Sequence, residues 1–159
     1  MDKSLLLSAI VGEITSALNN SLAAAEQARA TATNKENAAE NKYDTLGLEA
    51  AYLAHGQSER VLQLEKDLAA YVFLRDRLHD STMVEVGSLL RLEHVTGESR
   101  FLFIGPASGG LVINVHDVAV TVITTDSPLG KALLGAVIED DVSIGVPGGS
   151  GMARIADLW

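Results

Sequence analysis

The sequence predicts an α+β protein with two parts. An antiparallel α-helical coiled-coil hairpin is expected at residues 1–79, and a small antiparallel sheet domain with one short helix at residues 80–159. Three observations lead to this prediction. Apolar residues recur at alternating spacings of three and four through the first half, the first proline is Pro106, and β-branched strand patterns begin only after residue 80.

Two heptad seams predict the hairpin. The first begins at Leu7 and keeps a regular alternation of four and three residues, as in a coiled coil. The second ends at Tyr71 and, with Leu53 placed in the seam, contains one irregular step around Gln57 that is expected to relax the supercoil locally. Folding the two seams onto each other places the tip of the hairpin near residues 40–46.

Strand and turn signals fill the second half. We expect strands within 84–93, 100–104 and 117–125, and a closing β-hairpin whose turn is the sequence PGGSG. The stretch GPASGGLVI, residues 105–113, is typical of a loop. Between these elements a short helix is predicted, with Ser127 as its N-cap, Pro128 as its first residue and Gly135 as its end.

Composition excludes several classes of protein. The chain has a formal net charge of −9 and no cluster of Lys and Arg, so direct sequence-specific binding of nucleic acid is not expected. It has no cysteine, which excludes disulfides and thiolate metal sites. The N-terminal apolar patch is short and amphipathic, and no run approaches the length of a membrane span, so we expect a cytoplasmic protein with no membrane partner.

The residues offer no catalytic arrangement of their own. The four histidines show no metal-ligand spacing, and no Ser/His/Asp pattern or phosphate-binding loop is present in the sequence. The acids Glu40, Asp44 and Glu49 gather instead around the predicted hairpin tip, together with Tyr43. These acids fit two interpretations, either solvated charges that favour the start of a helix or groups carried to a partner. Tyr43 either packs across the hairpin end or contacts that partner.

The run SPLGKALLGAVIEDDVSIGVPGG, residues 127–149, resembles the C-terminal domain of the Gre family of bacterial transcript-cleavage factors. The resemblance is carried by an ordered set of residues: Ser127, Pro128, Leu129, Lys131, Ala132, Leu133, Leu134, Gly135, Asp140, Asp141, Val142, Pro147, Gly148 and Gly149. The order of a long hairpin followed by this domain is similar as well. The resemblance implies a C-terminal fold like that of the FK506-binding proteins.

The resemblance also implies a function. The C-terminal domain would dock on RNA polymerase at its secondary channel, and the hairpin would carry its tip acids to the polymerase active site. Two such acids would help to hold a second Mg²⁺ for transcript cleavage, a role that falls here to Glu40 and Asp44, with Glu36 and Glu49 as alternatives. The free protein is then expected to hold no metal or other cofactor and to be no enzyme itself. The expected partner contacts are Tyr43, Ser127, Pro128, Leu129, Lys131, Leu133 and Leu134.

The tip departs from the family pattern, which leaves alternatives open. One alignment places the family's tip on residues 33–40, where Thr33 replaces the leading acid; the other places it at Glu40 to Glu49, without the family's spacing. The chain is therefore either a cleavage-assisting factor, a channel-binding inhibitor or competitor without cleavage activity, or a coiled-coil interaction module. Isomerase activity is not expected, because few aromatics are present to wall a proline pocket. We expect a monomer or a weak dimer.

Overall fold

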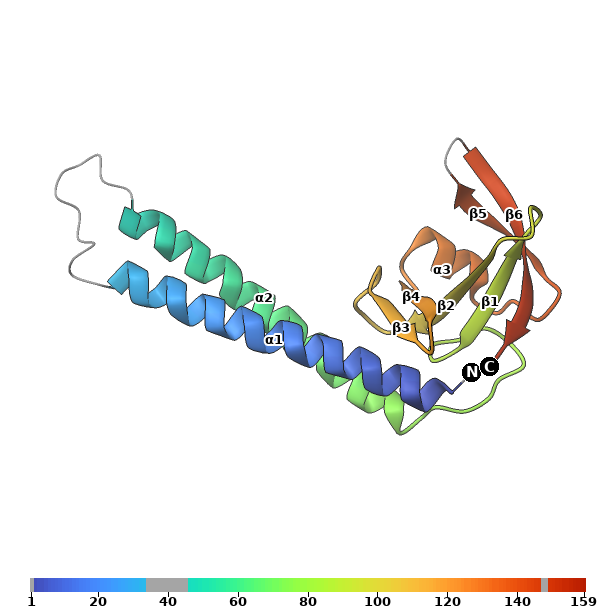
Figure 1. The fold of residues 1–159 in the computed structure, drawn as a ribbon, viewed down its shortest axis with the longest axis horizontal. Coiled ribbons are helices and arrows are strands. Elements are labelled where there is room, and N and C mark those ends of the chain that lie inside the picture. The colour runs from blue at the N-terminus through green and yellow to red at the C-terminus, as the bar shows by residue number, and fades with distance from the viewer. Residues whose placement is uncertain (1, 34–45, 147–148) are drawn as a thin grey trace. The chain divides into compact units, whose positions relative to one another are not determined.

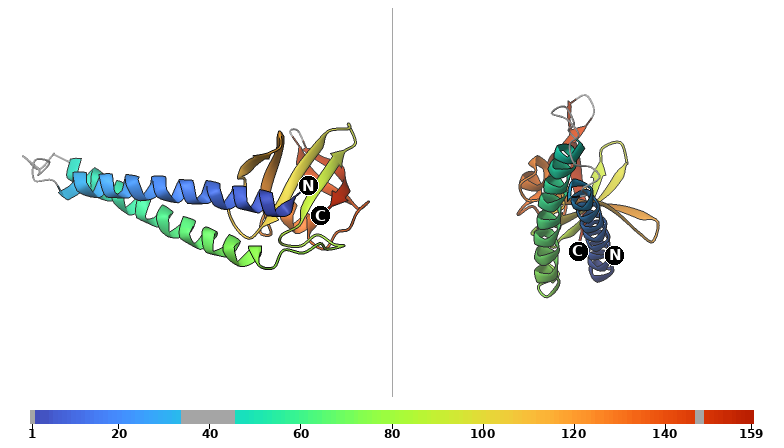
Figure 2. Two further views of the ribbon diagram at one scale, coloured as in Figure 1. Left: turned by 60° about the horizontal axis from the view of Figure 1, so that its bottom comes forward. Right: turned by 90° about the vertical axis from the view of Figure 1, so that its left-hand side faces the viewer.

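The computed structural model describes residues 2–33, 46–146 and 149–159 (Figure 1). Two long helices, α1 (Lys3–Thr33) and α2 (Leu46–Arg75), lie side by side and run in opposite directions (Figures 1 and 2). They are followed by six strands and one short helix. These are β1 (Leu89–His94), β2 (Ser99–Gly105), β3 (Val112–Val115), β4 (Val118–Thr124), α3 (Pro128–Leu133), β5 (Asp141–Val146) and β6 (Gly149–Leu158).

The chain divides into two compact units, one of Gly12–Leu68 and the other of Met1–Val11 with Ala69–Trp159. The expected domain boundary at residues 79 and 80 falls just after α2, but the unit that contains the sheet already includes the base of the hairpin. Tyr71 of α2 explains this grouping, because it is fully buried and its hydroxyl donates a hydrogen bond to the Ala107 carbonyl oxygen at 2.7 Å.

The seam of α1 is confirmed, because Leu7, Ile14 and Ala28 are buried and the seam positions between them are at least half-buried. The seam of α2 needs a correction. Leu53 is 56% exposed, and the neighbouring Ala54 is half-buried in its place. With position 54 in the seam, the spacing of four and three residues continues from position 50 to 71. The irregular step expected around Gln57 is therefore absent between positions 50 and 71.

The six strands form one sheet in the order β3-β4-β2-β1-β6-β5. All neighbouring pairs are antiparallel except β2 and β4, which are parallel with Phe103 opposite Val122. The predicted antiparallel sheet with one short helix is confirmed, and the parallel pair of β2 and β4 is the one feature of its pairing that was not expected. Strand β3 was not predicted, because the glycines of GPASGGLVI obscure the short strand that begins within that stretch. The first expected strand is also shorter, since β1 begins only at Leu89.

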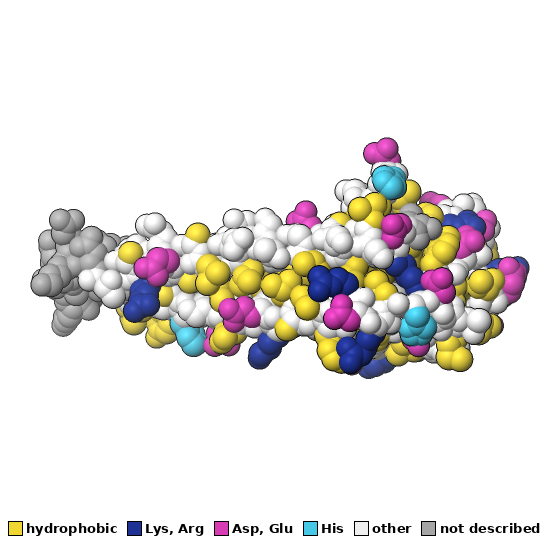
Figure 3. Space-filling view, turned by 90° about the horizontal axis from the view of Figure 1, so that it is seen from below, with side chains coloured by type: hydrophobic (Ala, Val, Ile, Leu, Met, Phe, Trp, Pro, Cys, Tyr) yellow, Lys and Arg dark blue, Asp and Glu magenta, His cyan; other side chains and the backbone are white. Residues whose placement is uncertain are grey.

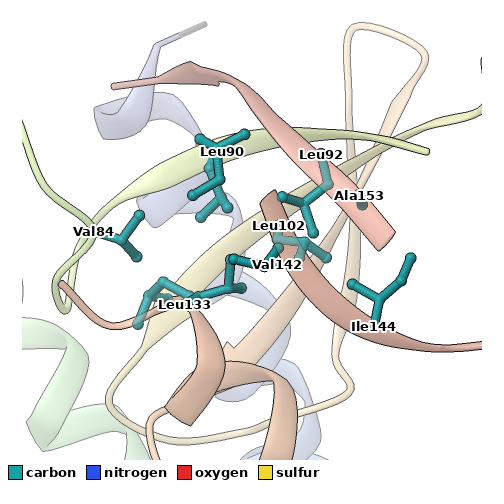
Figure 4. Packing of buried hydrophobic residues seen from close by; sticks show 10 residues of the cluster. Val84, Leu90, Leu92, Leu102, Leu133, Val142, Ile144 and Ala153 are labelled. Carbon is teal, nitrogen blue, oxygen red and sulfur yellow. The ribbon is translucent and has the colours of Figure 1, made fainter. Parts of the chain in front are cut away.

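The core of the sheet domain lies between α3 and one face of the sheet. Leu133 of α3 is fully buried and points toward Leu90, Leu102 and Val142 on three strands (Figure 4). Alternation along each strand puts these side chains on the same face. The short helix thus packs on this face through the buried Leu133 and the half-buried Leu129.

Several apolar side chains of the hairpin remain exposed. Figure 3 shows them gathered along the hairpin on the face in view, and the exposed set includes Leu22, Leu48, Tyr52, Leu53 and Leu62. By length and composition α1 is also long and apolar enough to cross a membrane, since an 18-residue stretch within Lys3–Thr31 has a mean hydropathy of 1.2. The expectation that no segment approaches this length was too strict, since it counted uninterrupted apolar residues only. A single such helix near an N-terminus is weak evidence for a span.

Candidate functional site

The predicted tip lies outside the described residues, and so do Glu36, Glu40, Tyr43 and Asp44. The alternative acid Glu49 is described. It is exposed in the first turn of α2, where its charge favours the positive end of the helix dipole. Among the described residues no group of three or more His, Asp or Glu side chains is placed to hold a metal ion. The two acids expected at the tip therefore stay a prediction.

The segment that carries the family resemblance builds a tightly held short helix. Ser127 caps α3 as predicted, since its Oγ accepts a hydrogen bond from the Gly130 N–H at 3.0 Å. The same hydroxyl donates to the Thr124 carbonyl oxygen at 2.8 Å, which ties the cap to the end of β4. Gly135 follows the helix with a φ of +80°, a backbone conformation that favours glycine. The local sequence thus determines where α3 begins and ends, and Ser127 ties its N-terminus to the end of β4.

The predicted contact residues of this segment separate into two groups. Pro128, Lys131 and Leu134 are exposed, and Leu129 is half-buried, so all four present surface to a partner. Leu133 does not, because its side chain is fully buried in the core. Its predicted role as a contact residue is corrected to that of a core residue that holds the helix in place.

Beside α3 the same face of the sheet opens into a cavity of about 380 Å³. A volume of this size lies within the range of ligand and side-chain pockets. Aliphatic residues form much of its lining, with polar ones from β1, the β1–β2 turn, β2 and β4. The lining consists of Leu92, His94, Thr96, Glu98, Arg100, Leu102, Thr121, Ile123, Leu129, Ile144 and Ala153.

Strand alternation explains why this pocket has an apolar floor and a polar rim. Leu92 and Leu102 are buried, whereas two residues further along the same face the chain places His94 on β1 and Arg100 on β2. Leu92 and Arg100 are direct cross-strand partners. Each strand therefore changes from aliphatic to polar side chains where it passes from the core toward the β1–β2 turn.

The rim offers donors of hydrogen bonds and charges of both signs. The Nδ1 atom of His94 accepts a hydrogen bond from the Thr96 backbone N–H at 3.3 Å and lies 2.8 Å from the Thr96 hydroxyl. An accepting Nδ1 leaves the ring proton on Nε2, which is a donor. Among the described residues neither Arg100 nor Glu98 forms an ion pair. An uncommitted cation and an uncommitted anion thus flank the apolar floor.

Large aromatic side chains do not contribute to this pocket. Phe103 is fully buried elsewhere, and Phe101 stacks on Trp159 with ring centroids 6.5 Å apart. The lining contains no Phe, Tyr or Trp within the described part of the chain. The pocket therefore suits aliphatic side chains flanked by polar groups, rather than the stacking that recognises a proline ring.

Sequence reasoning pointed to α3 but missed the pocket next to it. The signal that would have found it is the run of alternate positions along the strands, which reads Leu90, Leu92 and His94 on one strand and Leu102 and Arg100 on the next. Sequence alone does not say that α3 leaves this end of the face open, because that depends on the length and position of the helix.

Comparison with known proteins gives related sequences among transcription factors. The chain is 28% identical over 101 residues to transcription elongation factor GreA of Shouchella clausii, which covers 62% of the chain and 60% of that relative. It is 28% identical over 120 residues to the factor of the same name from Bacillus anthracis, with 74% and 69% covered. The alignment thus spans less than two thirds of the length of the first relative. No family model matches the chain.

Among solved structures, the GreA factor homolog 1 (Gfh1) of Thermus thermophilus is similar in fold. The likeness has a TM-score of 0.38 and 21% identity, and it covers 94% of each chain. At that score the likeness adds no support of its own. The matches in sequence are to proteins named as members of the family that residues 127–149 resemble.

Proposed function

We propose that the chain binds RNA polymerase and modulates transcription elongation, as its similarity to proteins named transcription elongation factor GreA suggests. The observation that carries this proposal is the open pocket beside α3, in the segment that matches the family motif. An apolar pocket with a few polar groups at its rim is a common form of protein docking site. The role is that of a factor acting on the polymerase rather than of an independent enzyme.

The docking part of the proposal rests on α3 and its surroundings. Leu129 is half-buried and lines the pocket, while Lys131 on the same short helix and Leu134, directly after it, are exposed. An aliphatic side chain of the polymerase would enter the pocket, and polar groups of the rim would fix its orientation. Loss of the apolar wall at Leu129 should therefore weaken binding more than the same change at an apolar residue outside the pocket.

A matched pair of variants tests the docking surface. Leu129→Asp places a charge on the pocket wall, and Val112→Asp places the same charge on β3, where Val112 is 53% exposed and outside the lining. For Leu129→Asp we expect binding to core polymerase at least about 10-fold weaker, the size typical of an interface hot spot. Val112→Asp should bind like the wild type. Equal affinities of the two variants would contradict docking at this pocket.

The hairpin supplies the second part of the proposal, action through the secondary channel of the polymerase. Two ordinary helices of 31 and 30 residues each span about 45 Å at 1.5 Å per residue, which is long enough to reach into a deep channel. In this role Glu40 and Asp44, or Glu36 or Glu49 in their place, would help to hold Mg²⁺ in the complex with polymerase. Each carboxylate would supply one oxygen ligand while water supplied others.

The tip is tested with a backtracked polymerase complex. The double variant Glu40→Ala with Asp44→Ala should bind polymerase as the wild type does, since these residues are far in sequence from the docking segment. If the acids act in cleavage, the variant loses stimulation of transcript cleavage. If the wild-type chain binds and slows elongation without stimulating cleavage, the chain is an inhibitor or competitor of the channel instead.

A third function, a coiled-coil interaction module unrelated to polymerase, is favoured by the exposed apolar side chains along the hairpin. It predicts concentration-dependent self-association or capture of other proteins by residues 1–79, and no affinity for core polymerase. Sedimentation of the purified chain separates this case from the monomer or weak dimer that we propose. The proposed place of action is the cytoplasm, where the polymerase acts.

A further inference from the structure

We propose that the polymerase segment which enters the pocket beside α3 carries an aliphatic anchor flanked by one acidic and one basic side chain, read by Arg100 and Glu98. This inference rests on the proposed function and adds the chemistry of the partner at the same site. It follows from the two charges at the rim, which the fold itself leaves uncommitted.

The neighbouring charges of the sheet show what is unusual about this pair. On the opposite face of β1, Arg91 forms an ion pair with Asp157, and on β6 Arg154 lies 3.2 Å from Asp141. Arg100 and Glu98, by contrast, form no ion pair with each other or with another described residue, although both line the pocket. Among the described residues, the other two arginines of the sheet are paired, whereas Arg100 is exposed at the rim of the pocket and unpaired.

The geometry sets the order of the partner's charges. Arg100 lies on β2 and Glu98 two residues before it, at the end of the β1–β2 turn, so their Cα atoms are separated by at most about 7 Å. Because the two charges are of opposite sign, no single ion can pair with both, and a docked segment would have to present one acidic and one basic side chain. The acid of the partner would lie toward Arg100, and its base toward Glu98, where the exposed β1–β2 turn ends.

A bound segment would also gain from the surroundings of these charges. Leu92 and Leu102 are buried in the floor next to Arg100, so a docked aliphatic side chain removes water from around the guanidinium group. An ion pair partly removed from water is stronger than one that is fully exposed. His94 adds a hydrogen-bond donor at its Nε2 atom, which suits a backbone carbonyl of the same segment.

The test exchanges the two charges while keeping everything else. The variant Glu98→Arg with Arg100→Glu keeps the net charge of the chain and the apolar floor, so it leaves non-specific electrostatics unchanged. Because it places like charges opposite each other in the complex, we expect binding to core polymerase to weaken by about 10-fold or more at low salt. The difference should shrink as salt is raised, since rim charges are screened.

The matched control exchanges Arg91 with Asp157, a pair on the opposite face that the exchange re-forms with reversed polarity, although the longer contact of Arg91 with Glu93, at 3.8 Å, is lost. This control should bind core polymerase like the wild type, and circular dichroism should show both variants folded. If the wild-type chain binds and the Glu98/Arg100 exchange binds equally well at low salt, the inference is overturned while the proposed function stands. If the wild-type chain does not bind core polymerase, the proposed function is overturned, and this inference with it.

Discussion

A methyl group added to Gly130 tests how closely α3 lies on the sheet. An alanine Cβ at this position would lie 2.0 Å from the carbonyl oxygen of Thr124 and 3.0 Å from Oγ of Ser127. The first distance is far inside van der Waals contact and involves backbone, which cannot rotate away. The variant Gly130→Ala must therefore move α3 or the end of β4, and with them the cap that Ser127 forms.

The size of the effect follows from two opposing contributions. Overpacking of a well-packed site costs about 1–3 kcal/mol of unfolding free energy, and a clash with backbone belongs in the upper part of that range. Replacing Gly by Ala inside a helix raises the unfolding free energy by about 1 kcal/mol, because alanine has the higher helix propensity. We therefore expect Gly130→Ala to lower the unfolding free energy of the sheet-containing unit by about 1–2 kcal/mol, or roughly 4–16 °C in Tm for a domain of this size.

The assay uses the single tryptophan of the chain, Trp159, whose ring stacks on Phe101 in the sheet-containing unit. Urea unfolding followed by its fluorescence reports on that unit. The matched controls are Gly12→Ala and Gly56→Ala, where the added Cβ meets nothing within 4 Å. Each control removes a helical glycine at an open site and should stabilise the hairpin, followed by circular dichroism, by up to about 1 kcal/mol. If Gly130→Ala raised the unfolding free energy as these controls are expected to do, the described packing of α3 would be refuted.

Three further variants test other parts of the fold. Leu53→Gln should change the unfolding free energy of the hairpin by less than about 0.5 kcal/mol. Ala54→Gln should lower it by more, because only position 54 lies in the seam. Equal losses for the two variants in urea unfolding would show that Leu53 lies in the seam after all. Tyr71→Phe leaves a carbonyl acceptor without its buried donor and should cost about 1–3 kcal/mol by Trp159 fluorescence, so an unchanged midpoint would contradict that hydrogen bond. Ser127→Ala should cost about 1 kcal/mol by removing the N-cap, while Ser127→Asp should largely keep it; a loss of equal size in both would argue against capping.

The two-part architecture was predictable because long periodic segments carry strong signals. The heptad spacing of α1 agrees with burial along most of the helix, and the cap, first residue and glycine end of α3 were read correctly. The choice between Leu53 and Ala54 was not predictable from residue type. A larger apolar side chain seemed the better seam residue, but the regular spacing of four and three places the small alanine there and leaves Leu53 exposed.

The arrangement of strands was harder to predict than their existence. Strand β3 has only four residues and follows a glycine-rich turn, so its pattern is too short to separate from a loop. The parallel pairing of β2 with β4 depends on the chain crossing past β3, which no local pattern encodes. The pocket beside α3 is lined by residues of both β2 and β4, so it depends on that pairing, and for that reason sequence reasoning identified the helix but not the site.

The hairpin tip was predicted from the sequence as the place of chemistry, and that prediction stands untested by the structure. The predicted set of docking residues is changed in one respect. Leu133, expected at the contact, supports the fold from inside, while Arg100 and Glu98, which no motif singled out, lie at the rim of the pocket. Residues that recognise a partner on a sheet surface come from several strands, so their proximity appears only in the folded chain.

The most direct test of the central claim is the competition between this chain and GreA of Bacillus anthracis for core RNA polymerase. The labelled chain is bound to core polymerase, and its release is followed as unlabelled GreA is added. Docking at a shared site predicts saturable binding and complete displacement, with Leu129→Asp displaced at a lower concentration of GreA than Val112→Asp. Absence of binding to core polymerase, or a complex that holds both proteins at once, would contradict the account.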